Sequence, residues 1–269
     1  MLRRFWCCLA YLVLLGGLLA RGPALADPQL DLALVIAVDV SSSMEAEEQG
    51  LQRAGFVEAF RSSLVHEAIR NGATGRIAVT YVEWSGVKDQ VVLVPWTIID
   101  GPEKATAFSA HLASKPVRQA GMTSISGVID FSRRLFSELG RESARRVIDI
   151  SGDGPNNDGR KVPLARDEAL AEGITINGLP IMFARTSNTP EMEGLDVYYR
   201  ECVIGGVGSF VMPLHDAEQF AMVIRTKIMR EIAGYQDTEA RIVPALSRMN
   251  CVTGEKSKEE DDLNIESSP

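Results

Sequence analysis

The chain has 269 residues, of which 45% are hydrophobic and 24% charged, and its formal net charge at pH 7 is −8. These values are typical of a soluble globular protein and exclude a disordered or collagen-like chain. The acidic balance argues against nucleic-acid binding, and three histidines and four cysteines without zinc or iron–sulfur spacing argue against a cysteine-rich metal centre.

The first 26 residues have the pattern of a secretory signal peptide. Arg3 and Arg4 precede an apolar run over 5–20, and small residues lead up to Ala26. We expect cleavage near Ala26 and a periplasmic or secreted protein with no stable membrane span. An uncleaved anchor is the alternative, although about 16 apolar residues are few for a span.

Strand-like and helix-like segments alternate after the signal peptide. The expected strands cover 32–38, 76–84, 90–99, 147–150, 174–181 and 209–214. The expected helices cover 45–70, 102–112, 123–139, 159–172, 195–202 and 216–233. This order indicates repeated βαβ units, hence a three-layer, doubly wound, Rossmann-like α/β domain. The βαβ units predict a mostly parallel sheet. Ser85 and Gly86 form a short hairpin connection, so we expect one antiparallel edge strand.

The domain is expected to cover 27–235, followed by a C-terminal segment over 236–269. Six acidic residues and two lysines lie between Glu255 and Pro269, with few apolar residues to bury. We expect this acidic tail to be disordered.

Two cysteines, Cys202 and Cys251, remain after signal cleavage. An oxidising compartment allows a disulfide between them. A buried thiol and a separate free thiol fit the sequence equally well, so both readings stay open.

A group of oxygen-bearing side chains follows the first expected strand. Asp39, Ser41 and Ser43 form a D-x-S-x-S run, which can converge on one point if the loop turns. Carboxylates and hydroxyls are the hard ligands that Mg²⁺ or Mn²⁺ prefers. The alternative is that Ser43 is only the N-cap of the next helix.

Two further residues lie where such a site would need them. Thr123 stands at the expected start of a helix, and Asp153 lies just beyond another buried strand, before a glycine. Each has a simpler explanation, since Thr123 could cap a helix and Asp153 could be a turn residue.

The five residues together resemble the metal-ion-dependent adhesion site of von Willebrand factor type A domains. The resemblance covers about 31–235, and the chain also looks like exported bacterial members known only as a domain of unknown function. The matching residues are Asp39, Ser41, Ser43, Thr123 and Asp153. The resemblance implies a non-enzymatic protein-binding module with one divalent cation, Mg²⁺ first and Mn²⁺ or Ca²⁺ as alternatives. It also implies an open coordination position that accepts an acidic side chain of a partner protein.

Loops around such a site usually select the partner. The expected partner-binding rim consists of Met122, Ser124, Asn156, Asn157 and Asp158. For Asp158, a solvated turn carboxylate is the simpler reading and an additional metal ligand the other.

Two other functional classes compete with this interpretation. A metal-dependent periplasmic hydrolase or phosphatase could use Asp39 as nucleophile. However, Ser41 occupies the place of the second aspartate of haloacid dehalogenases, and the chain has no G-x-S-x-G motif. A structural domain with a vestigial metal site is the third interpretation.

Overall fold

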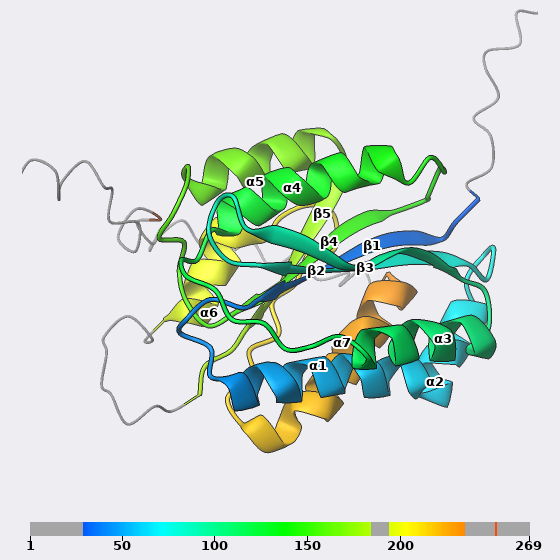
Figure 1. Ribbon diagram of the computed structural model, residues 1–269. Coiled ribbons are helices and arrows are strands. Elements are labelled where there is room, and N and C mark those ends of the chain that lie inside the picture. Colours follow the sequence, from blue (N-terminus) through cyan, green and yellow to red (C-terminus); the bar gives the residue numbers. More distant parts are fainter. Residues whose placement is uncertain (1–28, 184–193, 235–250, 252–269) are drawn as a thin grey trace, which may run out of the picture.

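The structure is a computed structural model that describes residues 29–183, 194–234 and 251 (Figure 1). The expected signal peptide and the acidic tail lie outside the described residues, and of the C-terminal segment over 236–269 only Cys251 is described. The strands are β1 (Leu32–Asp39), β2 (Ile77–Trp84), β3 (Gln90–Ile99), β4 (Arg146–Gly152) and β5 (Ile174–Pro180). They form one sheet in the order β3-β2-β1-β4-β5, in which only β3 runs antiparallel to its neighbour. The predicted mostly parallel sheet with an antiparallel edge strand is confirmed.

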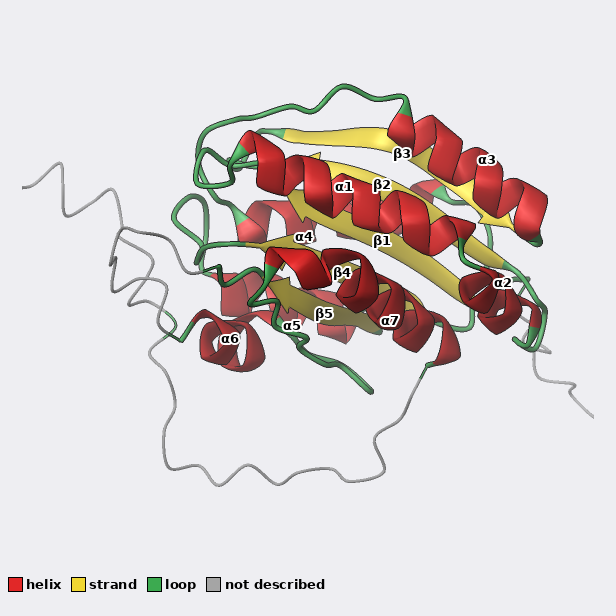
Figure 2. Ribbon diagram, turned by 90° about the horizontal axis from the view of Figure 1, so that it is seen from below, coloured by secondary structure: helices red, strands yellow, loops and turns green. Residues whose placement is uncertain are grey.

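Helices cover both faces of the sheet (Figures 1 and 2). One face carries α1 (Ala46–Arg61), α2 (Ser63–Arg70), α3 (Pro102–Ala113) and α7 (Phe220–Ala233). The other carries α4 (Ile125–Glu138), α5 (Val162–Ala171), α6 (Leu195–Tyr198) and the π-helical turn Tyr199–Val203. Every residue of β1 is buried, because β1 lies in the middle of the sheet with helices on both sides. The three-layer α/β architecture is therefore as predicted.

The helix expected over 45–70 is broken into two helices. Ser62 has an extended backbone with ψ 131°, which ends α1 and starts α2. Two apolar residues of these helices, Leu51 and Leu64, are 37% and 47% exposed. Gln52 and Arg53 are buried instead, because their polar groups find partners inside the protein.

The segment over 209–214 does not form the expected regular strand. It runs beside β5 and makes isolated bridges, with Val211 opposite Gly178 and Leu214 opposite Ile181. Pro213 has no N–H to donate, which interrupts a regular ladder.

The two last expected helices also differ from the structure. Only a short α6 and the π-helical turn form over 195–203, and a 3-10 turn, Ala217–Gln219, precedes α7.

The antiparallel edge strand β3 is irregular. Its pairing with β2 shifts register on both sides of Tyr81, and exposed Pro95 lies in its middle. Among the described residues, no helix is long and apolar enough to cross a membrane.

Candidate metal centre

Asp39 is the last residue of β1, and its carboxyl group is buried at the end of the sheet. Its Oδ1 accepts a 2.7 Å hydrogen bond from the backbone N–H of Ser41. Its Oδ2 is buried and has no hydrogen-bond partner among the described residues. A buried carboxylate oxygen without a partner is energetically costly, which marks it as a ligand candidate.

Three side chains next to Asp39 form a chain of short contacts. The hydroxyl oxygens of Ser41 and Ser43 are 2.9 Å apart, and the Ser43 hydroxyl donates to Asp153 Oδ1 at 2.7 Å. Asp153 follows β4, which pairs in parallel with β1. Since the carboxyl ends of adjacent parallel strands lie at the same edge, the two loops meet there.

The helix-capping explanations for Ser43 and Thr123 are wrong. The N-cap of α1 is Glu45, whose backbone N–H donates to Glu48 Oε2 at 2.8 Å. The N-cap of α4 is Ser124, whose hydroxyl accepts from the Gly127 N–H. Asp153 lies in a bend, as the turn explanation expects, but it is only 2% exposed and accepts the Ser43 hydrogen bond. The hydroxyls of Ser43 and Thr123 are therefore not needed at the helix starts.

Thr123 is held between the loops that follow β1 and β4. The Ser42 N–H donates to Gly121 O at 3.1 Å, which ties the first loop to the chain just before Thr123. The Thr123 N–H donates to Asn157 Oδ1 at 2.8 Å, and the Asn157 N–H donates back to Thr123 O at 2.8 Å. The fold thus brings all five expected ligand residues to one edge of the sheet.

The electrostatics of this edge favour a cation. Burial, and then the negative charge of Asp153, raise the pKa of Asp39 from 3.8 to about 8. No basic side chain is among the groups that shift this pKa. Two close carboxyl groups without a positive partner are stabilised by a bound cation.

The donor set fits a hard divalent ion. Within the described residues, no three His, Cys, Asp or Glu side chains gather at one point, so hydroxyls would supply the remaining ligands. Carboxylate and hydroxyl oxygens suit Mg²⁺, Mn²⁺ or Ca²⁺ better than softer metals. Gly152 allows the backbone of β4 to approach Asp39 closely. A side chain at this position would place its Cβ only 2.9 Å from Asp39 Oδ2.

The expected partner-binding rim is only partly exposed. Met122 is 45% exposed, and Asn157 also faces solvent. Asp158 is half-buried, and its Oδ2 accepts a 2.8 Å hydrogen bond from the Val87 N–H in the β2–β3 hairpin. It is therefore neither a merely solvated turn carboxylate nor free to bind through that oxygen.

Ser124 and Asn156 are wrongly placed in the rim. They are 0% and 1% exposed, so a partner could not contact them. Ser124 caps α4, and Asn156 Oδ1 accepts a 3.0 Å hydrogen bond from the Ser126 N–H. Both residues hold the start of α4 beside the loop that follows β4.

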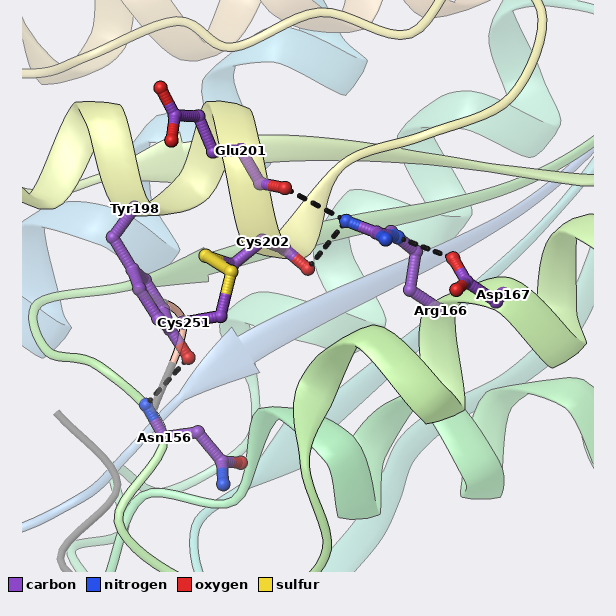
Figure 3. Close-up of a disulfide and its surroundings, with 7 residues drawn as sticks. All are labelled: Asn156, Arg166, Asp167, Tyr198, Glu201, Cys202 and Cys251. Atoms are coloured by element: carbon purple, nitrogen blue, oxygen red, sulfur yellow. Dashed lines mark hydrogen bonds and ion pairs between the residues drawn. A yellow bond between two sulfur atoms is a disulfide. The ribbon is translucent and has the colours of Figure 1, made fainter. Parts of the chain in front are cut away.

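The sequence interpretation missed two tyrosines next to the candidate site, Tyr198 and Tyr199. The Tyr198 hydroxyl accepts a 3.3 Å hydrogen bond from the Asn156 N–H (Figure 3). Tyr199 is fully buried near Asp39. No motif marks these tyrosines, but glycines at buried strand positions, Gly152 and Gly178, are a signal that a bulky side chain packs there.

A disulfide joins Cys202 in the π-helical turn to Cys251 (Figure 3). The sequence left this pairing open, and the structure contains it. The Arg166 guanidinium donates to the carbonyl oxygens of Glu201 and Cys202 at 2.9 and 3.1 Å, which also fastens this turn to α5.

Several solved structures share this architecture. Proximal thread matrix protein 1 from the mussel byssus, with a zinc-occupied MIDAS motif, matches at 16% identity and a TM-score of 0.54, covering 76% of this chain and 48% of that chain. The pilus adhesin SpaC from Lactobacillus rhamnosus GG matches at 13% identity and a TM-score of 0.57, covering 77% of this chain and 31% of that chain. A von Willebrand factor type A domain from Catenulispora acidiphila matches at 15% identity and a TM-score of 0.49, covering 76% and 43%.

The chain shares its α/β fold with the mussel protein and with the SpaC adhesin. It spans about half the length of the mussel protein and less than a third of SpaC. It belongs to the family described as protein of unknown function (DUF1194), whose profile matches residues 29–236. None of the curated proteins matches it.

Proposed function

We propose that this protein is a divalent-metal-dependent protein-binding module. Its metal ligands are Asp39, Ser41, Ser43, Thr123 and Asp153. Asp39 Oδ2 carries the proposal, since it is a buried carboxylate oxygen without a partner beside a second carboxyl group. The fold shared with the mussel protein, whose MIDAS motif holds zinc, supports the same interpretation.

The ligand set favours an ion that attracts an anionic group of a partner. A divalent cation bound here would supply positive charge for a partner carboxylate, because three of its five protein ligands are neutral hydroxyls. Ser43 is exposed, so the centre is open to solvent on that side. Met122 and Asn157 stand exposed on the neighbouring loops and would contact the partner. We therefore propose a protein partner that presents an aspartate or a glutamate.

The chemistry of the ligands supports Mg²⁺ first, with Mn²⁺ or Ca²⁺ as alternatives. Neither sulfur nor imidazole is among the five side chains, and oxygen-only sites suit these hard ions. The same absence favours binding over the zinc-type hydrolysis chemistry that uses imidazole ligands. We therefore propose that the domain is not an enzyme.

Thermal unfolding with and without metal tests the site. The protein starting at residue 27 is melted in chelator and in a titration of Mg²⁺ or Mn²⁺. At 100 times its dissociation constant a ligand stabilises the native state by about 2.7 kcal/mol, so the midpoint should rise clearly. The Asp39→Ala variant should not respond. The control Asp158→Asn should respond as the wild type does, because Asp158 binds the Val87 backbone.

An unresponsive wild type would favour a vestigial site and contradict the proposal. A second experiment then addresses the partner. Cross-linking in cell-envelope material should yield a partner in Mg²⁺ that is lost in chelator and in Asp39→Ala. A partner captured equally well in chelator would contradict metal-dependent binding.

Export and the domain boundaries are part of the same proposal. We expect residues 1–26 to be removed, leaving Asp27 as the N-terminus of a von Willebrand A-like domain over 27–235. N-terminal sequencing of the periplasmic or secreted protein tests this, and a mature chain that retains Arg3 and Arg4 would contradict it.

A further inference from the structure

The π-helical turn Tyr199–Val203 reaches from the disulfide to the metal centre. Tyr198, Tyr199 and Cys202 all point inward and are 5%, 0% and 0% exposed. They belong to the same buried cluster as the face of the sheet that packs on α4 and α5. The segment over 198–203 therefore carries the disulfide at Cys202 and Tyr198, whose hydroxyl reaches the Asn156 N–H (Figure 3). It also carries the buried Tyr199.

Two strand glycines make the space that Tyr199 occupies. A Cβ on Gly178 in β5 would lie 2.6 Å from the Tyr199 ring, closer than real Cβ contacts allow. A Cβ on Gly152 in β4 would lie 3.0 Å from the Tyr199 hydroxyl oxygen. The ring thus lies directly on the sheet backbone, and its hydroxyl reaches the end of β4, where Asp153 begins the metal-binding loop.

Two buried oxygens without a hydrogen-bond partner among the described residues, Asp39 Oδ2 and the Tyr199 hydroxyl oxygen, both lie close to Gly152. The same Cβ position that is 3.0 Å from the Tyr199 hydroxyl is 2.9 Å from Asp39 Oδ2. A phenol hydroxyl is a donor and a carboxylate is an acceptor, so the two groups are chemically complementary.

We propose that Tyr199 is a positioning residue of the metal centre, and that the Cys202–Cys251 disulfide holds it in place. The Tyr199 hydroxyl orients the Asp39 carboxylate through one bridging water molecule. The disulfide restrains the π-helical turn at Cys202, three residues after Tyr199. The Arg166 guanidinium holds the same residue through its carbonyl oxygen. This inference rests on the proposed metal-binding function.

Tyr198 supports the same loop from a second point. Its hydroxyl accepts from the Asn156 N–H, and Asn156 in turn fixes the Ser126 N–H at the start of α4. Displacement of the turn would therefore disturb both the Asp39 carboxyl group and the loop that carries Asp153.

The affinity for Mn²⁺ in the purified protein tests the inference, with a paramagnetic resonance spectrum of the bound ion as the second readout. Tyr199→Phe keeps the ring in its slot and removes only the hydroxyl. Outer-shell partners of metal ligands typically change affinity by 10–100-fold, so we expect a loss of about tenfold or more and an altered spectrum. The matched control is Ser132→Ala, which removes another buried hydroxyl without a partner, in α4. It should bind Mn²⁺ as the wild type does.

The disulfide is tested in the same assay, far below the melting temperature. Reduced wild-type protein and Cys251→Ser should both bind Mn²⁺ more weakly than the oxidised wild type. Unchanged affinity in Tyr199→Phe would overturn the role of the hydroxyl, and unchanged affinity in Cys251→Ser would overturn the role of the disulfide. A wild type that binds no Mn²⁺ would instead refute the proposed function, and this inference with it.

Discussion

The Ser43 hydroxyl donates a 2.7 Å hydrogen bond to Asp153 Oδ1, although 110 positions separate the two residues in the chain. This contact exists because β1 and β4 are adjacent parallel strands whose following loops leave the sheet at the same edge. Ser43 is available for it because Glu45, rather than Ser43, caps α1. The site therefore depends on the strand order as much as on the D-x-S-x-S run.

Replacing Asp39 by asparagine should stabilise the metal-free protein. Burial raises the pKa of Asp39 from 3.8 to about 8, so at pH 7 the carboxyl group is ionised in the unfolded chain but disfavoured as an anion in the folded protein. Asparagine removes this free-energy cost of folding and keeps an acceptor for the Ser41 N–H. Since one pKa unit corresponds to about 1.4 kcal/mol, we expect a gain on the order of 1 kcal/mol or more in chelator. Urea unfolding measures it. Asp130→Asn, which removes a partner of Arg160, should instead lower stability, and a loss of stability in Asp39→Asn would contradict the assignment.

Thr123→Val should weaken metal binding far more than folding. The side chain keeps its shape and loses only the hydroxyl that we assign to the ion, so Mn²⁺ affinity should fall about tenfold, on the scale seen when metal-site hydrogen bonds are removed. Thr80→Val is the counterpart, because the buried Thr80 hydroxyl donates to Val94 O at 2.9 Å inside the sheet. That variant should lose about 1 kcal/mol of stability and keep its affinity. Equal affinity in Thr123→Val and wild type would remove Thr123 from the ligand set.

Lys227→Met should be severely destabilising. Lys227 in α7 is 1% exposed, and its Nζ lies 2.8 Å from Asp149 and 2.7 Å from Glu231. Removing this cation leaves buried carboxylates without compensation, which typically costs about 3–5 kcal/mol. Denaturant unfolding measures the loss. Lys104→Met on the exposed side of α3 is the control and should change stability by about 0.5 kcal/mol or less. A similarly small effect in Lys227→Met would show that the buried cluster is not ionised.

Acid should weaken the contact between α4 and α5. Hydrogen bonds from Arg160 and then Arg133 lower the pKa of Glu168 from 4.5 to about 2. Because the folded pKa is the lower one, its stabilising contribution is complete above about pH 5 and is lost as the pH falls towards 2. The melting temperature of Glu168→Gln should therefore differ from wild type at pH 7 and converge with it near pH 2. The exposed Glu138 in α4 provides the control Glu138→Gln, and parallel curves for Glu168→Gln and wild type would contradict the expectation.

The sequence predicted the elements whose signal is local. The apolar run of β1 predicted a central strand buried on both faces, and the Ser85-Gly86 hairpin predicted the antiparallel edge strand. The break at Ser62 was not visible, because apolar residues continue at helical spacing on both sides of it. The burial of Arg53 was not visible either, because its partner Glu83 lies on β2, and helical periodicity does not reveal such a contact.

In the candidate site, too, residues with a local sequence signal could be predicted, and residues that depend on long-range packing could not. The D-x-S-x-S run and the residues Thr123 and Asp153 could be proposed as ligands from their places at loop and strand ends. The burial of Ser124 and Asn156 was not, because it depends on how the start of α4 packs against the loop after β4. Tyr199 was missed since its nearness to Asp39 arises only when a distant segment folds over Gly152 and Gly178.

The irregular strand β3 has a consequence for the behaviour of the protein in concentrated solution. At the other edge of the sheet, β5 is covered by the segment over 205–214, which leaves β3 as the uncovered edge within the described residues. A strand from another molecule could add there only along a continuous row of backbone donors and acceptors. Pro95 interrupts that row, and the register shifts beside Tyr81 twist it. This backbone chemistry disfavours the addition of a further strand at β3.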